Sequence, residues 1–454
     1  MMKSVNPASG EVVQTYEIYS GKGVEKIINS VDKNWHHWRS TSFFHRSQLM
    51  QNLSSLLKTK KEDLARLMAL EMGKVIKEGI AEIEKCAWVC DYYAQNAESF
   101  LENEIISTDA SHSFVSYQPL GTVLGVMPWN FPFWQVFRFA APTIMAGNTA
   151  VLKHASNVPG CAMAIEELFR EAGFPDNVFR TLLIGSNLVE AVIKHPAVKA
   201  VSLTGSTPAG KSVAAIAGSV LKKCVLELGG SDPYLILKDA DLKSAAKICV
   251  AGRLLNAGQS CIGAKRFIVI DDVYPEFLEY FTYEMINAQF GDPCDPEITM
   301  GPMARTDLRD ELHRQVLDSV NKGAEVLIGG EIPNRNGAFY PPTILEYVKP
   351  GMPAYEEELF GPVAAVIRVE NTEEAVRVAN DSEFGLGAAV FTKNENKGEN
   401  IAEFQLQAGC CFVNDFVKSD PRMPFGGIKG SGFGRELSTH GIKEFMNVKT
   451  VVVK

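Results

Sequence analysis

The sequence predicts an α/β protein with two sheet-containing parts and a small β arm. Its 454 residues are too many for one ordinary core, so two or three domains are expected. Short apolar runs alternate with helical segments from about residue 120, and this alternation restarts near residue 229. Such βαβ alternation is typical of parallel sheets covered by helices on both faces. The chain ends in "NVKTVVVK", a β-branched run that resembles an edge strand.

The first hundred residues are predicted to be helical, because apolar residues recur there at three- and four-residue spacing among Lys and Glu. "HSFVSYQPL" then alternates like a strand. These first elements are expected at 22–38, 43–72 and 76–102 as helices and at 112–120 as a strand.

The two alternating parts give the main sheets. The first has strands at 122–128, 148–154, 179–185, 198–205 and 222–228, with helices near 134–146, 157–172, 187–194 and 206–217. The second has strands at 233–239, 265–271, 363–369, 386–392 and 410–414, with helices near 241–255, 273–288, 303–321, 372–380 and 396–405. We therefore group 1–110 with 121–228 as one domain, 229–435 as another, and 111–120 with 436–454 as arm strands.

Charge and cysteine usage limit the possible partners and compartments. The net charge of -9 argues against a nucleic-acid or anionic membrane surface. Nine cysteines, an odd number without paired CxxC motifs, favour a reducing, cytoplasmic location over a disulfide framework. We expect no signal peptide, because the N-terminus lacks an apolar run. The uncharged stretch 114–137 is long enough to span a bilayer, but its prolines and glycines favour strand, loop and helix start instead.

Two strand ends favour nucleotide binding. "VSLTGSTPAGKSV" ends a strand, turns through Gly205 and Ser206, and starts a helix with Pro208 near its first position. Free N–H groups and the helix dipole favour a pyrophosphate there, although an ordinary capped helix fits the same pattern. Lys153 stands at the end of another apolar strand and suits a ribose or phosphate; a solvated lysine is the alternative.

Three further residues suggest covalent chemistry. Glu227 lies inside an apolar strand, where burial raises the pKa of a carboxyl group and suits it to act as a base, unless nearby turn N–H groups simply satisfy it. Asn130 lies in an aromatic, proline-bounded loop, where its amide can donate to an oxyanion or form an Asx turn. Cys261, in "NAGQSC", is either a nucleophile or a small buried hydrophobe.

Taken together and in order, the motifs resemble the aldehyde dehydrogenase superfamily. They are "PWNFP", "GNTAVLKHAS", "LTGST", "LELGG", "NAGQSC", "EELFGPV" and "PFGGIKGSGFGRE", and the resemblance extends from "NPASGE" to the terminal strand. It implies an aldehyde-dehydrogenase-like fold with a Rossmann-type cofactor domain, an α/β catalytic domain (229–435) and a β oligomerisation arm. It also implies a homodimer or homotetramer and no metal.

The resemblance assigns roles to the three chemical residues. Cys261 attacks the aldehyde carbon, and Asn130 with the cysteine N–H holds the oxyanion. Hydride then leaves to the nicotinamide, and Glu227 activates the water that cleaves the thioester. A second cysteine that forms a redox switch in some relatives is replaced here by Gly263.

The cofactor positions follow from the same resemblance. They are Trp129, Lys153, Ser156, Gly205, Ser206, Glu358 and Phe360. Ser156 stands where NAD-preferring members often carry a glutamate that would repel a 2′-phosphate, so NADP is expected, with NAD also possible.

The substrate positions resemble those of short bacterial succinate-semialdehyde dehydrogenases. Arg138 matches an arginine that would hold the distal carboxylate of a short ω-oxo acid, unless it pairs with an acidic neighbour. Trp134, Ser419 and Ser438 are further candidates. A second substrate arginine of some of these enzymes is Leu255 here. The expected function is NAD(P)-dependent oxidation of succinate semialdehyde to succinate.

Two alternatives stay open. One is an aldehyde dehydrogenase of broader specificity, or a CoA-acylating one, although CoA-acylating members usually lack the equivalent of Glu227. The other is a cysteine hydrolase or acyltransferase that uses no nicotinamide cofactor, for which His154 is the nearest histidine in a motif.

Overall fold

The first sheet is built from the strands that begin at residue 122. The computed structural model describes residues 1–454. Its six-stranded sheet has the order β19-β9-β8-β5-β6-β7, and the pairs among β5 to β9 are parallel. The strands are β5 (Thr122–Met127), β6 (Thr149–His154), β7 (Phe179–Thr181), β8 (Val198–Thr204), β9 (Lys223–Glu227) and β19 (Gly432–Phe433).

The strand order reverses between β5 and β8. From β5 the chain moves outward to β6 and β7, then returns to the other side of β5 to form β8 and β9. In open parallel sheets a ligand binds beyond the carboxyl ends of the strands at such a switch point. The loops that follow β5 and β8 therefore mark the expected cavity.

Helices cover both faces of this sheet, because successive side chains of each strand point to opposite faces. Val123 and Leu152 pack into the core under α4 and α5, whereas Leu124 and Val151 pack into the core under α1, α6 and α7. The helices are α1 (Gly21–Trp38), α2 (Phe43–Met72), α3 (Ile76–Phe100), α4 (Trp134–Met145), α5 (Pro159–Glu171), α6 (Val189–Lys194) and α7 (Thr207–Ser219).

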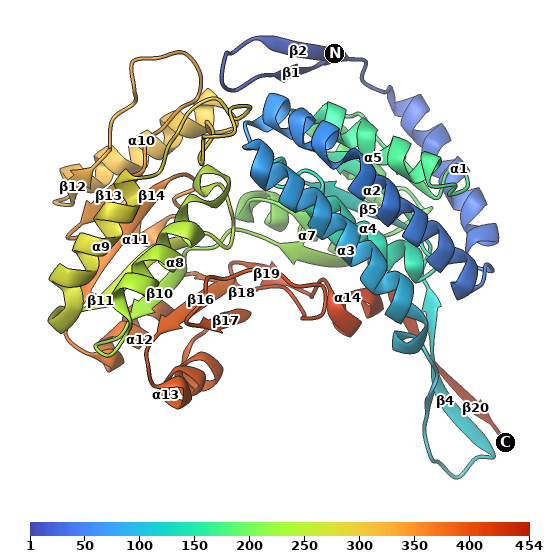
Figure 1. Ribbon diagram of the computed structural model, residues 1–454. Coiled ribbons are helices and arrows are strands. Elements are labelled where there is room, and N and C mark those ends of the chain that lie inside the picture. The colour runs from blue at the N-terminus through green and yellow to red at the C-terminus, as the bar shows by residue number, and fades with distance from the viewer.

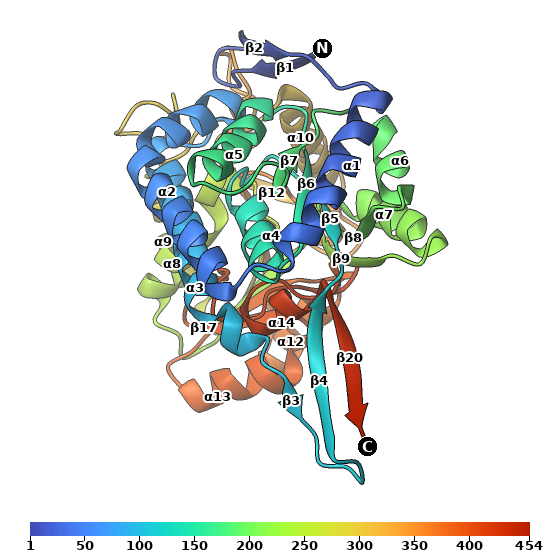
Figure 2. The same ribbon diagram turned by 90° about the vertical axis from the view of Figure 1, so that its right-hand side faces the viewer.

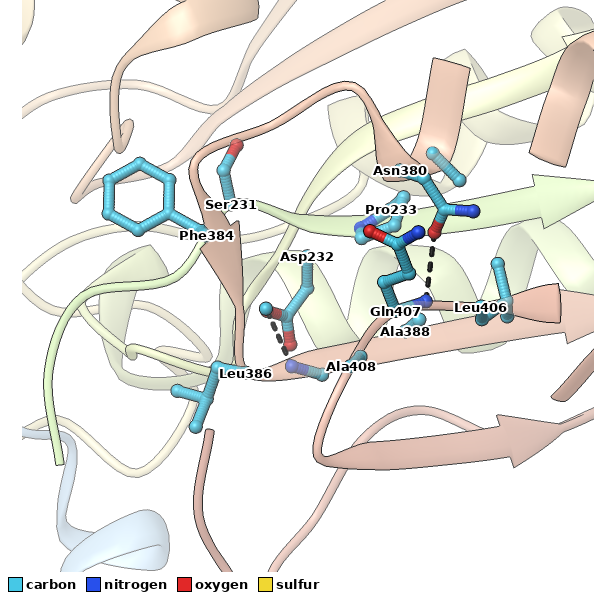
Figure 3. A pocket seen from close by; sticks show the side chains of 13 residues that line it. Ser231, Asp232, Pro233, Asn380, Phe384, Leu386, Ala388, Leu406, Gln407 and Ala408 are labelled. Atoms are coloured by element: carbon cyan, nitrogen blue, oxygen red, sulfur yellow. Dashed lines mark hydrogen bonds between the residues drawn. The ribbon is translucent and has the colours of Figure 1, made fainter. Parts of the chain in front are cut away.

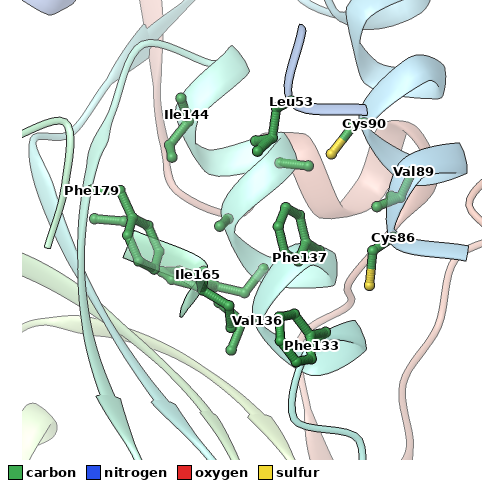
Figure 4. Packing of buried hydrophobic residues seen from close by; sticks show 14 of the residues in the cluster. Leu53, Cys86, Val89, Cys90, Phe133, Val136, Phe137, Ile144, Ile165 and Phe179 are labelled. Carbon is green, nitrogen blue, oxygen red and sulfur yellow. The ribbon is translucent and has the colours of Figure 1, made fainter. Parts of the chain in front are cut away.

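The long helices α2 and α3 form an outer layer over α4. Figure 4 shows Phe133, at the N-cap of α4, and Phe137 on the side of Cys86 and Cys90 of α3, while Val136 lies toward Ile165 of α5. Every residue of α4 is buried, so the loop that contains Asn130 leads into a helix that is packed on all sides.

The second sheet has seven strands in the order β12-β13-β14-β11-β10-β16-β17, and Figure 1 shows it beside the first. Its strands are β10 (Asp232–Ile236), β11 (Ala264–Ile270), β12 (Glu325–Ile328), β13 (Thr343–Glu346), β14 (Val363–Val369), β16 (Gly387–Phe391) and β17 (Cys410–Val413). Its helices are α8 (Leu242–Leu254), α9 (Tyr274–Ile286), α10 (Thr306–Asn321), α11 (Pro353–Glu356), α12 (Thr372–Asn380) and α13 (Glu395–Asn400). Its alternating side chains again feed two separate cores.

A three-stranded arm completes the fold. It has the order β20-β4-β3, formed by β3 (Glu104–Ile105), β4 (His112–Pro119) and β20 (Met446–Val453). Both ribbon views show β4 and β20 extending away from the rest of the chain (Figures 1 and 2). The remaining elements are β1 (Met2–Val5), β2 (Val12–Tyr16), β15 (Phe384–Gly385), β18 (Ile428–Lys429), α14 (Ser438–Lys443) and the short turns η1 (Ser186–Leu188), η2 (Leu255–Gly258), η3 (Asp271–Val273) and η4 (Ile401–Gln405).

The α/β class and the order of the main elements are confirmed, with local differences. Strand β19 falls within the part that we grouped with the second sheet, yet it pairs with β9 of the first sheet. The helix expected at 396–405 is α13 followed by the π-helical turn η4. The hairpin β1–β2 and the strands β12 and β13 are additions. None of the helices is both long and apolar enough to cross a membrane.

Candidate active site

A cavity lies at the switch point of the first sheet, as its topology requires. It has a volume of about 260 Å³. Trp129 and Asn130 enter it from the loop after β5, and Gly205 and Ser206 from the turn after β8. Its lining also includes Thr204, Leu228, Cys261, Glu358 and Phe360. The ring of Trp129 meets that of Phe360 edge to face at 5.8 Å.

The residues around this cavity fit a dinucleotide. Helix α7 begins at the turn with no side chain capping its first N–H groups and no acidic residue in its first turn, so these groups remain free to bind a phosphate. Lys153, at the carboxyl end of β6, is half-buried. Burial lowers the pKa of Lys153. Ser156 lies nearby in the loop after β6 and is exposed. We therefore place the pyrophosphate at α7 and the ribose at Lys153 as predictions.

The loop that carries Cys261 has an unusual backbone. Asn256, Ala257 and Gly258 all have positive φ, at 57°, 53° and 72°. A Cβ on Gly258 would stand 2.3 Å from the carbonyl oxygen of Gly361, so only glycine fits there. Positive φ disfavours alanine, which means that contacts around the loop must hold this conformation.

Side chains from several elements hold the cysteine loop. The amide of Asn256 donates to the carbonyl oxygens of Asn130 (2.6 Å) and Gln259 (3.1 Å). The carboxylate of Glu78, on α3, accepts from the backbone N–H of Asn256 at 3.0 Å. Lys265 Nζ donates to the carbonyl oxygens of Ser260 and Cys261 at 2.8 and 2.9 Å. The position of Cys261 is thus set by α3, by β11 and by the loop after β5.

Burial and charge act in opposite directions on Cys261. Burial raises the pKa of its thiol to about 12, whereas the positive charges of Arg138 and Lys265 lower it by less. The thiol is therefore protonated at neutral pH in this state. A positive ring bound in the adjoining cavity, or a base that takes the proton, would shift it toward the thiolate.

Asn130 is oriented by two hydrogen bonds. Its Nδ2 donates to the carbonyl oxygen of Gln259 at 3.0 Å, and its Oδ1 accepts from Gln135 Nε2 at 3.0 Å. A side-chain amide has two N–H groups, so one remains to donate. The backbone N–H of Cys261 bonds to no carbonyl group. These two N–H groups therefore have no acceptor in the protein, as the predicted role of oxyanion donor requires.

Glu227 is a buried carboxylate without hydrogen bonds. It lies at the end of β9, is 1% exposed, and neither oxygen has a partner. Burial raises its pKa well above the usual value, and Arg138 opposes that shift in part. Its side chain leans toward Gly426, next to Phe425 of a second cavity. Such a carboxyl group has the properties of a general base near neutral pH.

The second cavity approaches Cys261 from the side of α3 and α4. Its volume is about 190 Å³, and Cys261 lines this cavity as well as the first. Three of the predicted substrate positions, Trp134, Arg138 and Ser419, line it. The lining also includes Glu78, Glu82, Lys85, Gln135, Leu255, Lys418 and Phe425. The cysteine therefore stands where the two cavities meet.

Arg138 is on the second turn of α4, lines this cavity, and pairs with Glu436 through Nε. Its Nη2 donates to Thr204 Oγ1 at 3.2 Å. The alternative that Arg138 pairs with an acidic neighbour thus has a specific partner, while its role toward the substrate stays a prediction.

Ser438 lines neither cavity, and its role as a substrate position stays a prediction without support from the cavity linings. Its Oγ accepts from the backbone N–H of His440 at 3.2 Å, and its carbonyl oxygen accepts from Tyr93 at 3.0 Å. Ser438 also has a positive φ of 52°. These contacts fix the start of α14.

A small polar pocket at Asp232, drawn in Figure 3, is too small for a substrate. Its volume of about 10 Å³ is on the scale of a single water. Asp232 Oδ1 accepts from Gly387 N at 3.0 Å, while Oδ2 has no partner. Burial raises the pKa of Asp232 to about 7, which Lys265 opposes.

The sequence reasoning missed the contribution of α3. Glu78, Glu82 and Lys85 all line the second cavity. Their spacing places them on one face of a helix, but polar residues on an amphipathic helix usually face water. The role of Lys265 in holding the cysteine loop was not predicted either, because a lysine at the start of a strand is usually exposed to solvent.

Fold and site together define a class of protein: one that holds a cysteine between a dinucleotide cavity and a second cavity. Comparison with known proteins agrees, since the sequence profile of the aldehyde dehydrogenase family matches residues 1–451. The chain belongs to the aldehyde dehydrogenase family.

Individual relatives cover nearly the full chain. A probable succinate-semialdehyde dehydrogenase [NADP(+)] of Synechocystis is 48% identical, with 99% of this chain and 98% of the relative aligned. A succinate semialdehyde dehydrogenase [NAD(P)+] of Escherichia coli K12 is 44% identical, over 99% and 97%. A solved succinic semialdehyde dehydrogenase of Streptococcus pyogenes, in complex with NADP+, has a TM-score of 0.98 at 37% identity and covers both chains fully.

Proposed function

We propose that this chain catalyses the NADP-dependent oxidation of succinate semialdehyde to succinate. The observation that carries the proposal is the place of Cys261, which lines both the switch-point cavity and the second cavity. One thiol can therefore meet an aldehyde from one side and a nicotinamide from the other. The names of the Synechocystis and Escherichia coli relatives and of the Streptococcus pyogenes structure supply the substrate and the cofactor.

The chain's own residues carry the addition step. The thiol of Cys261 gives up its proton to a base, its sulfur bonds to the aldehyde carbon, and the carbonyl electron pair moves to oxygen. The free N–H of Asn130 Nδ2 and the backbone N–H of Cys261 donate to that oxyanion. When bound, NADP+ would supply the hydride acceptor, so that the carbon bonded to Cys261 would be oxidised to the thioester level.

Hydrolysis requires a base. Glu227 takes a proton from water as the water oxygen bonds to the thioester carbon; the C–S bond then breaks, and Cys261 regains a proton. Glu227 is suited to this step because burial raises the pKa of its carboxyl group. In this scheme Trp129, Gly205, Ser206, Glu358 and Phe360 hold the cofactor.

An absorbance assay at 340 nm tests the proposal. The purified protein should reduce NADP with succinate semialdehyde at a kcat/KM roughly tenfold to a hundredfold above that for butanal, the range expected of one charge-assisted contact. Cys261→Ala should abolish turnover but keep NADPH binding. Equal rates for both aldehydes would indicate a broad-specificity aldehyde dehydrogenase, and ester cleavage without NADP reduction would indicate a cysteine hydrolase.

We also propose a homodimer or homotetramer in a reducing, cytoplasmic environment. The exposed strands of the arm support the first point. The second is supported by nine cysteines that are all free, three of them on α3 and α5 and fully buried.

A further inference from the structure

The second cavity contains three cationic side chains, and two of them are already neutralised. Arg138 pairs with Glu436, and Lys418 Nζ lies 2.5 Å from Asp415. Lys85 is different, because no carboxylate lies within ion-pair distance of its Nζ. Its Nζ instead bonds to Ser419 Oγ at 2.9 Å and lies 4.4 Å from the centre of the Trp134 ring.

The acidic residues of the same cavity do not compensate Lys85. Glu78 accepts from the backbone N–H of Asn256. Glu82 bonds to Lys74 and also accepts from the backbone N–H groups of Phe133 and Trp134. Lys85 is therefore the one cation of this cavity that has no ion-pair partner.

Ser419 points to the same ligand chemistry. A hydroxyl group has one donor and two acceptor lone pairs. Ser419 Oγ accepts from Lys85 Nζ and, at 3.1 Å, from Trp134 Nε1, which uses both lone pairs. Its own hydrogen has no acceptor in the protein, so a ligand that fits here must accept hydrogen bonds.

We propose that Lys85 and Ser419 form the subsite that binds the distal carboxylate of the substrate, with Lys85 as the residue that determines specificity. The inference rests on the proposed oxidation of succinate semialdehyde. An ammonium group with unused donors and a hydroxyl that must donate match the two oxygens of a carboxylate. Arg138 then acts on the site through its pair with Glu436, as a positioning residue.

The test compares two aldehydes across four proteins. In Lys85→Met the charge is lost and the chain length is kept, so kcat/KM for succinate semialdehyde should fall roughly tenfold to a hundredfold, mainly through KM, while butanal changes little. Lys85→Arg keeps a cation and should recover part of the preference. Lys77→Met makes the same change at an exposed lysine of α3 outside the cavity and should behave as the wild type.

Each outcome separates the inference from the proposed function. If the wild type prefers succinate semialdehyde and Lys85→Met keeps that preference, the inference is wrong and the function stands. If the wild type shows no preference, the proposed substrate itself fails. Should Lys85→Met not fold, as judged by NADPH binding, Lys85→Gln provides the same comparison with a polar side chain.

Discussion

Glu227 shows how much a single residue reveals about function. An ionised carboxylate buried without hydrogen bonds is costly, and a structural role alone would favour a neutral residue. Its oxygens have no partner even though Arg138 and Arg435 are close enough to influence it. A residue that destabilises its surroundings in this way is a strong candidate for a chemical role.

Glu227→Gln should therefore slow the second half of the reaction. The amide keeps the shape of the side chain but cannot take a proton from water, so the thioester should accumulate. Rapid mixing of enzyme, NADP and succinate semialdehyde should show a burst of NADPH of about one equivalent followed by a slow steady state. Loss of the burst as well would place Glu227 before hydride transfer, for example as the base for the Cys261 thiol.

Ser156→Glu tests the cofactor preference. A carboxylate at this exposed position would face the 2′-phosphate of NADP and repel it, while NAD carries a hydroxyl there. KM for NADP should rise roughly tenfold or more, and KM for NAD should stay within about twofold. Ser156→Ala serves as the control, since it removes a hydroxyl donor without adding charge. Equal changes for both cofactors would show that Ser156 does not contact the 2′ group.

At the residue scale the sequence predicts groups that belong to local motifs and misses those defined by distant partners. Cys261, Asn130 and Glu227 each lie in a short pattern with chemical meaning. The pair of Arg138 with Glu436 could not be predicted, because the two residues are far apart in the chain and meet only when α4 packs beside the C-terminal loop. The contact of Lys85 with Ser419 could not be predicted for the same reason, although Ser419 itself is among the predicted substrate positions.

At the scale of elements, α3 connects the core to both sides of the site. Its Glu78 holds the cysteine loop, and its Glu82 holds the start of α4 through the N–H groups of Phe133 and Trp134. Glu82 also pairs with Lys74, and the side chains of both are almost fully buried. Breaking such a pair leaves a charge without compensation in the core.

Glu82→Gln should lower the free energy of unfolding by about 3–5 kcal/mol, because Lys74 would stay buried without its counter-charge. Denaturant unfolding followed by circular dichroism measures the change. Glu84→Gln is the matched control: Glu84 lies on the same helix and pairs with Lys61 on the surface at 2.6 Å, so its loss should change stability little. If both variants unfold alike, the Lys74–Glu82 pair is not structurally important.

Long, strongly periodic elements are the ones that the sequence predicts well. Helices α2 and α3 begin at the expected residues, and each of the ten expected sheet strands forms within one residue of its expected run. Short or half-exposed elements are not predicted from the sequence. Strand β12 and the hairpin β1–β2 carry mostly exposed side chains and show no clear apolar periodicity. Their positions depend on tertiary pairing rather than on local pattern.

At the scale of the whole molecule, the reaction depends on how two sheets are placed. The first sheet supplies the switch-point cavity, and the second supplies β11, which begins just after Cys261. The arm takes no part in either cavity. Its shape instead suits contact with another subunit.

The sheet of the arm has an unpaired edge at strand β20. In the order β20-β4-β3, the strand β20 pairs with β4 along its whole length and has one free edge. Val448 and Val452 stand on the same side of β20 and are 61% and 56% exposed. A long apolar edge of this kind is prone to pair with another chain.

Adding charge to this edge should weaken self-association. In Val448→Lys/Val452→Lys, two exposed valines become ammonium groups that would repel each other across a subunit contact. The molecular mass in solution, measured by light scattering after gel filtration, should therefore fall by at least half. Val12→Lys/Val13→Lys makes the same change on β2, whose valines are 52% and 40% exposed, and should leave the mass unchanged. A mass unaffected by the arm variant would mean that β20 is not at the interface. If activity also persists in the smaller species, each subunit contains a complete site.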